Sequence, residues 1–418
     1  MADYNTIKLP QLAWYGDTEL NVELPSSWDV TICRMRGYSR PRLTQPETKH
    51  AFSHPIGSQP IRELARGKKE VVILFDDLTR PTPVAELVPY ILEELEVAGI
   101  PDERIRFIAA LGAHRALTRI DFVKKLGEAV LDRFPVYNHN PYENCTFVGK
   151  TSRGTPVSIN SEVMSCDLKL GIGSIVPHAA ASFGGGGKII LPGVASMDTI
   201  AANHALAARA RERGRSGSMT HGIGFEENEL RLDIAEAAKM VGLDVKVDAI
   251  INNKREITAL FVGEPLAAHL EGVKLAKEVY MTEPVGKRDI VISNAYAKGT
   301  EPFHASPLGA RMLTEAGGDL VLIDNTPEGL ITHYLGGSWG KNIGGRYWQR
   351  RSRLLPRVKR LILLTEYLDR AEAVRIAPLD LVTWVKTWGE ALEYLTKDYP
   401  GEAKVAVIPD GTIQYIPE

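Results

Sequence analysis

Cysteine is scarce in this sequence: Cys33, Cys145 and Cys166 are the three cysteines of a chain of 418 residues. They stand far apart and no two of them form a CxxC pair, so neither a disulfide framework nor a thiolate zinc site is expected. We interpret them as buried free thiols in a reducing compartment.

An excess of charge of one sign and long apolar runs are also missing. The formal net charge is −2, which provides no overall field to attract nucleic acid or a membrane surface. No apolar run approaches the roughly 20 residues that span a bilayer, and the N-terminus lacks the basic and apolar regions of a secretory signal. We therefore predict a cytoplasmic protein without a nucleic-acid or membrane partner. The sequence leaves the oligomeric state open.

The chain instead shows a repeated alternation of strand-like and helix-like segments. Its apolar content of 44% and charged content of 24% are typical of globular proteins, and its length fits two or three domains. We predict an α/β fold with two α/β domains, mostly parallel sheets and the active site in the cleft between them. The Pro- and Gly-containing segment 281–287 is the expected boundary, which gives domains 1–280 and 281–418.

The expected elements follow from the period of the apolar residues. A hairpin is expected around Gly16-Asp17. The expected strands are 70–76, 105–111, 168–172, 247–251, 257–262, 289–293, 320–323, 360–364 and 405–408. The expected helices are 83–98, 119–126, 196–213, 266–280 and 388–396.

Polar clusters follow three of these strands directly. Asp77 and Arg80 lie in DDLTRPTP after the strand 70–76, and His114 lies in GAHR after 105–111. His178 and a run of four glycines follow 168–172. Because ligands of parallel sheets bind beyond the carboxyl ends of the strands, we expect one shared site. A local Asp–Arg pair, with Thr79 capping the next helix, is the alternative for the first cluster.

The glycine run 184–187, followed by Lys188, is the most unusual segment. Glycine tolerates positive φ and lets backbone approach a ligand closely, and Lys188 offers a cation or an amine nucleophile. Neither a Walker P-loop nor a dinucleotide fingerprint fits, because Ser182 and Val176 occupy positions that require glycine. We predict an anion or cofactor loop of another kind.

Histidines are the candidate acid/base and metal-binding groups. His114 and His178 at two strand ends suggest a pair of acid/base groups. His204 lies on a predicted helix, and the residues around it form no familiar metal motif. His333 and the aromatic residues Tyr334, Trp339 and Trp348 fit a pocket wall and interdomain packing equally well.

These motifs together resemble the nickel-dependent lactate racemase family over essentially the whole length. The resemblance rests on DDLTRPTP at 76–83, on LGAHR at 111–115 and on SIVPH…GGGGKIILPG…NH between 174 and 204. In that family a nickel-pincer nucleotide (a pyridinium-3,5-bisthiocarboxylic acid mononucleotide) holds nickel through two sulfurs and a ring carbon, and one histidine completes the set.

The resemblance implies a role for each candidate residue. It makes His204 the nickel ligand and Lys188 the residue that can tether the cofactor through a thioamide. It implies loading by cofactor-biosynthesis proteins. The remaining cofactor contacts that it implies are Asp77, Thr79, Arg80, Gly185, Gly186 and Gly187.

The implied reaction is inversion at C2 of a 2-hydroxy acid. His114 and His178 correspond to the catalytic pair: one takes the hydroxyl proton while the C2 hydride moves to the cofactor, and the other protonates after hydride returns to the opposite face. We expect substrate contacts from Arg115, Lys298, His304 and Trp339.

The C-terminal domain departs from the family pattern. Lactate racemases carry a Tyr-Gln pair and then a substrate-binding lysine, whereas Phe303-His304 and Pro307 align there in this chain. We therefore expect a 2-hydroxy acid larger or more polar than lactate. Two alternatives stay open: an oxidoreductase that releases the 2-oxo acid, and a non-catalytic carrier of the cofactor.

Overall fold

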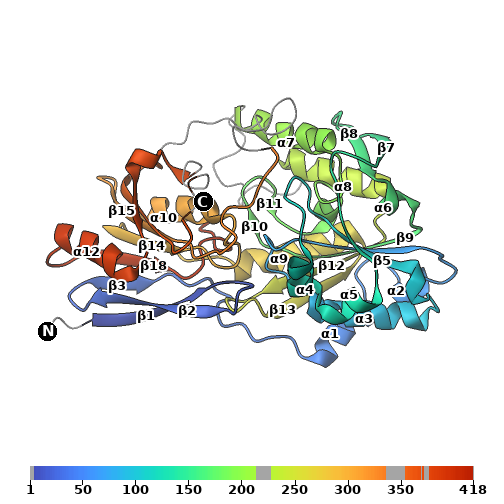
Figure 1. Ribbon diagram of the computed structural model, residues 1–418, viewed down its shortest axis with the longest axis horizontal. Helices are drawn as coiled ribbons and strands as arrows, with labels where there is room; N and C mark the ends of the chain where they lie inside the picture. Colours follow the sequence, from blue (N-terminus) through green and yellow to red (C-terminus); the bar gives the residue numbers. More distant parts are fainter. Residues whose placement is uncertain (1–3, 213–226, 336–353, 369, 371–375, 418) are drawn as a thin grey trace. The chain divides into compact units, whose positions relative to one another are not determined.

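Figure 1 shows the computed structural model, which describes residues 4–212, 227–335, 354–368, 370 and 376–417. The chain divides into two compact units. The first contains residues 4–39 and 279–331 and the described residues from 354 onward. The second contains 40–278, less the undescribed segment 213–226, together with 332–335.

The second unit is built on a six-stranded sheet of order β13-β12-β9-β4-β5-β6. All neighbours are parallel except β13, which runs antiparallel to β12. The strands are β4 (Val71–Phe75), β5 (Ile105–Ala109), β6 (Val136–Asn138), β9 (Leu168–Ser174), β12 (Val245–Ile251) and β13 (Ile257–Gly263). Two small hairpins are β7 (Cys145–Lys150) with β8 (Pro156–Asn160) and β10 (Pro177–His178) with β11 (Ser182–Phe183).

Helices connect these strands, as parallel pairing requires. They are α1 (Gln45–Ser53), α2 (Ile61–Leu64), α3 (Val84–Val97), α4 (Arg119–Leu126), α5 (Glu128–Arg133), α6 (Ser161–Ser165), α7 (Met197–Glu212), α8 (Glu229–Val241) and α9 (Pro265–Val279), with 3-10 turns η1 (Asp102–Arg104) and η2 (Gly186–Ile189).

The continuous apolar runs of the central strands reflect burial on both faces of this sheet. In β4, Val71, Ile73 and Phe75 pack into one hydrophobic cluster. Val72 and Leu74, which point the opposite way, pack into another cluster with residues of α7 and α8. Full burial of such a side chain contributes roughly 1.5–3 kcal/mol, so both faces of the strand must be apolar.

The first unit holds a parallel sheet of order β17-β16-β15-β14-β18-β3. Its strands are β3 (Asp29–Ile32), β14 (Ile290–Asn294), β15 (Gly318–Ile323), β16 (Val358–Leu364), β17 (Val382–Val385) and β18 (Lys404–Ile408). The hairpin β1 (Tyr4–Gln11) and β2 (Thr18–Pro25) precedes them. The helices include α10 (Ala305–Met312) and α12 (Trp388–Asp398), with 3-10 turns η5 (Pro302–His304) and η6 (Leu379–Leu381).

The N-terminal segment belongs to the first unit, whereas we expected it in the same domain as residues 40–280. The cause is β3, which pairs in parallel with β18 near the other end of the chain, blue beside red in Figure 1. A four-residue strand with exposed and half-buried positions has no clear sequence pattern. The cleft expected between two domains stays a prediction.

Most expected elements lie within one or two residues of the observed ones. The hairpin, the α/β fold and the mainly parallel sheets are confirmed. The elements that were not expected include the helices α1, α2, α5, α6, α8 and α10 and the strands β3, β6, β7, β8, β10, β11 and β17. No helix within the described ranges combines the length and apolar character needed to cross a bilayer. The thiols of Cys33 and Cys166 are buried as expected, but Cys145 is half-buried on the hairpin strand β7.

Candidate active site

The three polar clusters lie where neighbouring strands of the second unit end. In the sheet order, β4 lies between β9 and β5. Asp77 follows β4, His114 follows β5, and His178 follows β9. Because the strands run parallel, their carboxyl ends face the same edge of the sheet, where side chains from the three loops can converge.

Asp77 orients the imidazole of His114. The Nδ1 atom of His114 lies 2.6 Å from Oδ2 of Asp77, and both side chains are nearly buried. Burial opposes the charge of Asp77, but His114, Arg80 and Thr79 together lower its pKa to about 2. An ionised carboxylate accepts only, so Nδ1 carries the proton that it donates to Asp77. The lone pair of neutral His114 is then on Nε2, which is the tautomer that a general base requires.

Thr79 donates hydrogen bonds to Asp77 and does not cap the next helix. Its backbone N–H and its hydroxyl both donate to Oδ1 of Asp77, at 2.9 and 2.5 Å. Arg80 in turn donates through Nη1 to the hydroxyl oxygen of Thr79, at 2.9 Å. Helix α3 begins at Val84 without a side-chain cap. The alternative of a helix-capping Thr79 is therefore wrong, and the segment is organised around the carboxylate that holds His114.

We expect Asp77→Asn to lower kcat by about 10²–10⁴-fold, because an amide can donate to Nδ1 and hold His114 in the wrong tautomer; the loss matches the range of general acid–base effects. The protein should remain folded near neutral pH. Asp77 stabilises the fold as an anion, and that contribution is present above about pH 4 and is lost as the pH falls towards about 2. Single-turnover rates and thermal unfolding at pH 7 check both expectations; an unchanged kcat would contradict the role of Asp77.

His178 is also held through Nδ1. The backbone N–H groups of Ala180 and Ala181 donate to Nδ1 at 3.2 and 3.1 Å. An accepting Nδ1 places the proton of the neutral ring on Nε2, the opposite tautomer to His114. The Nε2 atom lies 3.5 Å from Nζ of Lys188. The glycine loop therefore brings its lysine to the second histidine.

The glycines of the loop pack against a buried polar cluster of Arg231, Lys246, Asp248 and His269. A Cβ at Gly186 would lie 2.8 Å from the ring of His269, and a Cβ at Gly185 would lie 2.9 Å from the Asp248 carboxylate. Asp248 accepts the Gly186 N–H and the Lys246 ammonium, both at 2.6 Å. Close packing of the loop on this cluster therefore requires glycine. A cofactor contact of Gly185, Gly186 and Gly187 stays a prediction.

We expect Gly186→Ala to destabilise the protein by about 2–4 kcal/mol, the sum of a left-handed conformation at φ +57° and overpacking against His269. Gly99→Ala is the matched control, because Gly99 also has positive φ, +78°, but nothing lies within 4 Å of its Cβ position. Gly99→Ala should cost only about 1–2 kcal/mol. Chemical denaturation of the two variants checks the difference, and equal losses would contradict the packing argument.

The ring of His204 is held in a defined orientation by its own helix. It lies on α7, which begins after Ser196, and the Ser196 hydroxyl accepts the N–H of Thr199 as expected of an N-cap. Nδ1 of His204 donates to the Ile200 carbonyl at 2.9 Å, so the lone pair of the neutral ring is on Nε2. Burial and then the charge of Lys188 lower the pKa of His204 to about 4, and His114 adds to the effect. A backbone hydrogen bond of this kind is typical of metal-bound histidines.

A metal at His204 must bring ligands of its own. Within the described residues, no group of three or more His, Cys, Asp or Glu side chains can hold a metal ion. A neutral imidazole with a defined Nε2 lone pair, and Lys188 nearby, fits a metal whose other ligands belong to an organic cofactor. Because the electrostatic influence of Lys188 and His114 reaches His204, the three groups share one neighbourhood.

His333 joins this site, which the sequence left open. Residues 332–335 run beside 113–115: Arg115 N–H donates to the Thr332 carbonyl at 3.2 Å, and Tyr334 N–H donates to the Ala113 carbonyl at 2.7 Å. The rings of His114 and His333 meet edge to face, with centroids 5.1 Å apart. Such a distant pairing has no local sequence signal. The cluster of Lys246 and Asp248 did have one, because alternate charged residues stand in the otherwise apolar strand β12.

The expected substrate residues fall into separate groups. Arg115 donates to Asp121 Oδ2 at 3.1 Å, where Asp121 takes part in the capping box of α4. In the first unit, the ammonium of Lys298 and Nε2 of His304 each lie 3.8 Å from Oε2 of Glu301. All three are almost fully or largely buried. Trp339 and Trp348 lie outside the described residues.

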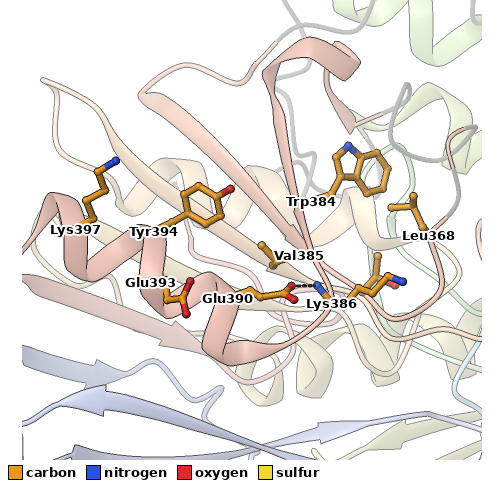
Figure 2. Close-up of a pocket in the computed structure, with 9 residues that line it drawn as sticks. Leu368, Trp384, Val385, Lys386, Glu390, Glu393, Tyr394 and Lys397 are labelled. Atoms are coloured by element: carbon orange, nitrogen blue, oxygen red, sulfur yellow. Dashed lines mark hydrogen bonds between the residues drawn. The ribbon is translucent and has the colours of Figure 1, made fainter.

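The first unit also contains a cavity of about 560 Å³, shown in Figure 2. Trp384 and Tyr394 contribute its aromatic surface, and the Lys386 N–H donates to Oε2 of Glu390 at 2.7 Å beside it. None of the expected site residues lines it. Those expected site residues that the structure describes therefore lie elsewhere.

The chain is similar to known proteins over most of its length. Residues 15–217 match the lactate racemase N-terminal domain. The lactate racemase of Lactiplantibacillus plantarum is 29% identical over 395 residues, which cover 88% of this chain and 90% of that protein. The lactate racemase of Thermoanaerobacterium thermosaccharolyticum is 26% identical over 418 residues, 95% of this chain and 96% of that protein.

Solved structures share the fold. The lactate racemase apoprotein from Thermoanaerobacterium thermosaccharolyticum has a TM-score of 0.73 at 24% identity, covering 99% of this chain and 100% of that one. A protein from Thermotoga maritima has a TM-score of 0.66 at 17% identity, covering 90% of this chain and 99% of that one. Sequence and fold are similar to those of lactate racemases along nearly the full length of the chain, and residues 15–217 match the N-terminal domain of that family.

Proposed function

We propose that this protein is a racemase or epimerase that inverts C2 of a 2-hydroxy acid with the help of a nickel-pincer nucleotide. The observation that carries the proposal is the pair of imidazoles His114 and His178. They come from two strand ends, and each is held through Nδ1, so Nε2 is the ring nitrogen that would act on the substrate. Inversion requires such a group on each side of the substrate.

The cofactor would be held by residues of the second unit. Nε2 of His204 would coordinate nickel, and Lys188 would tether the nucleotide, with Asp77, Thr79, Arg80 and the glycine loop as further contacts. When bound, the nucleotide supplies reversible acceptance of the C2 hydride. The protein supplies orientation and proton transfer.

The two histidines differ in what they offer in the described state. His114 presents a lone pair on Nε2 and accepts the hydroxyl proton of the substrate, while Asp77 stabilises the imidazolium that forms. With Nδ1 accepting backbone N–H groups, His178 would present an N–H on Nε2 to the substrate oxygen once Lys188, whose Nζ lies 3.5 Å away, is tethered to the cofactor and no longer an ammonium. In the reverse direction His178 accepts the hydroxyl proton and His114 is the donor, so both rings must be able to change protonation state.

We propose a substrate larger or more polar than lactate. The support is the group Lys298, Glu301 and His304 near the start of α10, where lactate racemases carry a Tyr-Gln pair and a lysine. A buried lysine binds a substrate carboxylate, and a carboxylate such as Glu301 accepts hydrogen bonds from substrate hydroxyls. A sugar acid offers a carboxylate to Lys298 and hydroxyls to Glu301, whereas an aryl-substituted acid suits the contact between its carboxylate and Lys298.

The test uses protein loaded with the nickel-pincer nucleotide and single enantiomers or epimers of lactate, malate, aryl-lactates and gluconate-like acids. Chiral separation, or separation of C2 epimers for sugar acids, measures inversion. We expect inversion of at least one larger acid at a higher kcat/KM than lactate. Lactate as the best substrate would contradict the substrate proposal alone, whereas no inversion by nickel-loaded protein would contradict the proposed function.

A further inference from the structure

A second cavity, of about 340 Å³, lies behind the glycine loop in the second unit. Helix α8, the start of α9 and the backbone of Gly187 line it. Its apolar lining comes from Ile234, Ala235, Ala238, Leu243 and Leu266. Its polar lining comes from Arg231, Glu236, Lys239, Glu264 and His269. A cavity of this size with a mainly apolar wall and a few polar groups suits a small organic molecule.

Arg231 is the polar group of the lining whose hydrogen bonds are incomplete. Its side chain is 3% exposed, and Nη2 donates to the carbonyls of Gly185 and Gly184 at 2.9 and 3.3 Å. Its Nη1 is buried and meets no hydrogen-bond acceptor among the described residues. A buried guanidinium nitrogen without an acceptor is unfavourable, so an acceptor supplied by a ligand would stabilise this arrangement.

The lining carries two cations against two carboxylates, so the feature that favours an anion is the buried Arg231 donor that lacks an acceptor within the residues that the structure describes. Burial lowers the pKa of Arg231 to about 10, against the opposing effect of Asp248, so the guanidinium stays charged near pH 7. His269 contributes no positive charge, because burial and then Arg231 lower its pKa well below the usual value. Lys239, at the C-terminal part of α8, adds a second cation to the lining.

The carboxylates near Arg231 already have partners. Asp248 accepts the Lys246 ammonium and the Gly186 N–H. Oε2 of Glu264 accepts the N–H groups of Leu266 and Ala267 at the start of α9. Glu236 accepts the N–H and hydroxyl of Ser152, both at 2.6 Å. With two carboxylates in the lining, the cavity suits a single negative charge better than a multiply charged anion.

We propose that this cavity binds a small organic monocarboxylate, whose carboxylate accepts from Nη1 of Arg231 and whose apolar body packs on α8 and Leu266. The lining contains none of the proposed acid/base or metal-binding side chains and shares only Gly187 with the proposed cofactor contacts, and the existence of the site does not depend on the proposed reaction. A ligand bound in the cavity also affects the glycine loop. Arg231 holds the Gly184 and Gly185 carbonyls, and Gly187, which lines the cavity, directly precedes Lys188.

The test measures binding of benzoate to the full chain without cofactor, by calorimetry at pH 7, with benzyl alcohol as the uncharged probe. Benzoate lacks a 2-hydroxyl group and cannot be turned over. We expect saturable binding of benzoate, at least tenfold weaker binding of benzyl alcohol, and slower amide hydrogen exchange in residues 184–188 when benzoate is present. No saturable binding of benzoate, or equal binding of benzyl alcohol, would overturn the proposal.

Two variants test whether benzoate binds in this cavity. Ala235→Trp and Leu266→Trp each fill the cavity from a different helix, and each should weaken benzoate binding at least tenfold and remove the exchange protection. Ala129→Trp adds the same side chain at an exposed position of α5 and should bind benzoate as the wild type does. Leu266 is 36% exposed, so its variant tests the cavity even if Ala235→Trp does not fold. Wild-type affinity in folded Leu266→Trp would locate the ligand elsewhere and overturn the proposal.

Discussion

Replacement of His178 by alanine is expected to reduce inversion at C2 by about 10³-fold or more, in line with the 10²–10⁴-fold effects of general acid–base groups. The bound nickel should remain nearly unchanged, because His178 is held by backbone N–H groups of its own hairpin and the proposed metal ligand is His204. Chiral separation of the products and metal analysis of the same preparation measure the two quantities.

The combination of results matters more than the loss of activity. A folded, nickel-containing His178→Ala protein without inversion supports a proton-transfer role. If one enantiomer still exchanged its C2 hydrogen with a deuterated substrate pool, the remaining His114 would be acting alone on one face. Full inversion by the variant would contradict the assignment of His178.

His204→Ala is the second change with a large expected effect, a loss of nearly all bound nickel. A single protein ligand is expected here, because no cluster of three ligating side chains exists in the described part of the chain. The low pKa of His204, about 4, keeps the ring neutral at pH 7. Protons should therefore compete for this ligand only as the pH falls towards about 4, well below the ordinary histidine range.

His139→Ala is the matched control for this experiment. His139 is also buried, its Nε2 donates to the Ala195 carbonyl at 2.9 Å, and burial lowers its pKa to about 4. Both variants remove a buried neutral imidazole from the same unit and should lose comparable stability. Only His204→Ala should lose nickel. Equal nickel contents in wild type and His204→Ala would remove the assignment, and parallel losses in both variants would indicate general destabilisation.

The interaction of Arg231 with the glycine loop bears on both experiments. Lys188 reaches His178 from a loop whose backbone is fixed by Arg231 on one side and by Asp248 on the other. The position of Lys188 therefore depends on the buried groups Arg231 and Asp248. Substitutions of Arg231 or Asp248 should therefore reduce cofactor attachment more than they reduce the rate of proton transfer.

Local sequence patterns were sufficient where the determining forces are local. The apolar run of β4 and the period of α3 follow from burial on two faces and on one face respectively, and both elements were predicted within two residues. The clusters at Asp77, His114 and His178 were predicted at strand ends because parallel strands share a carboxyl edge. The motifs in these loops also indicated the similarity to lactate racemases.

Tertiary structure decided what depends on pairing between distant segments. The register of β3 against β18 sets the membership of the N-terminal segment, and the pairing of His333 with His114 extends the site. The glycines 185–187 are required by Asp248, His269 and Ala238, which lie more than 50 residues further along the chain. The tautomers of His114, His178 and His204 were decided in the same way, because a proton's place on an imidazole depends on which donor or acceptor the fold brings to the other nitrogen.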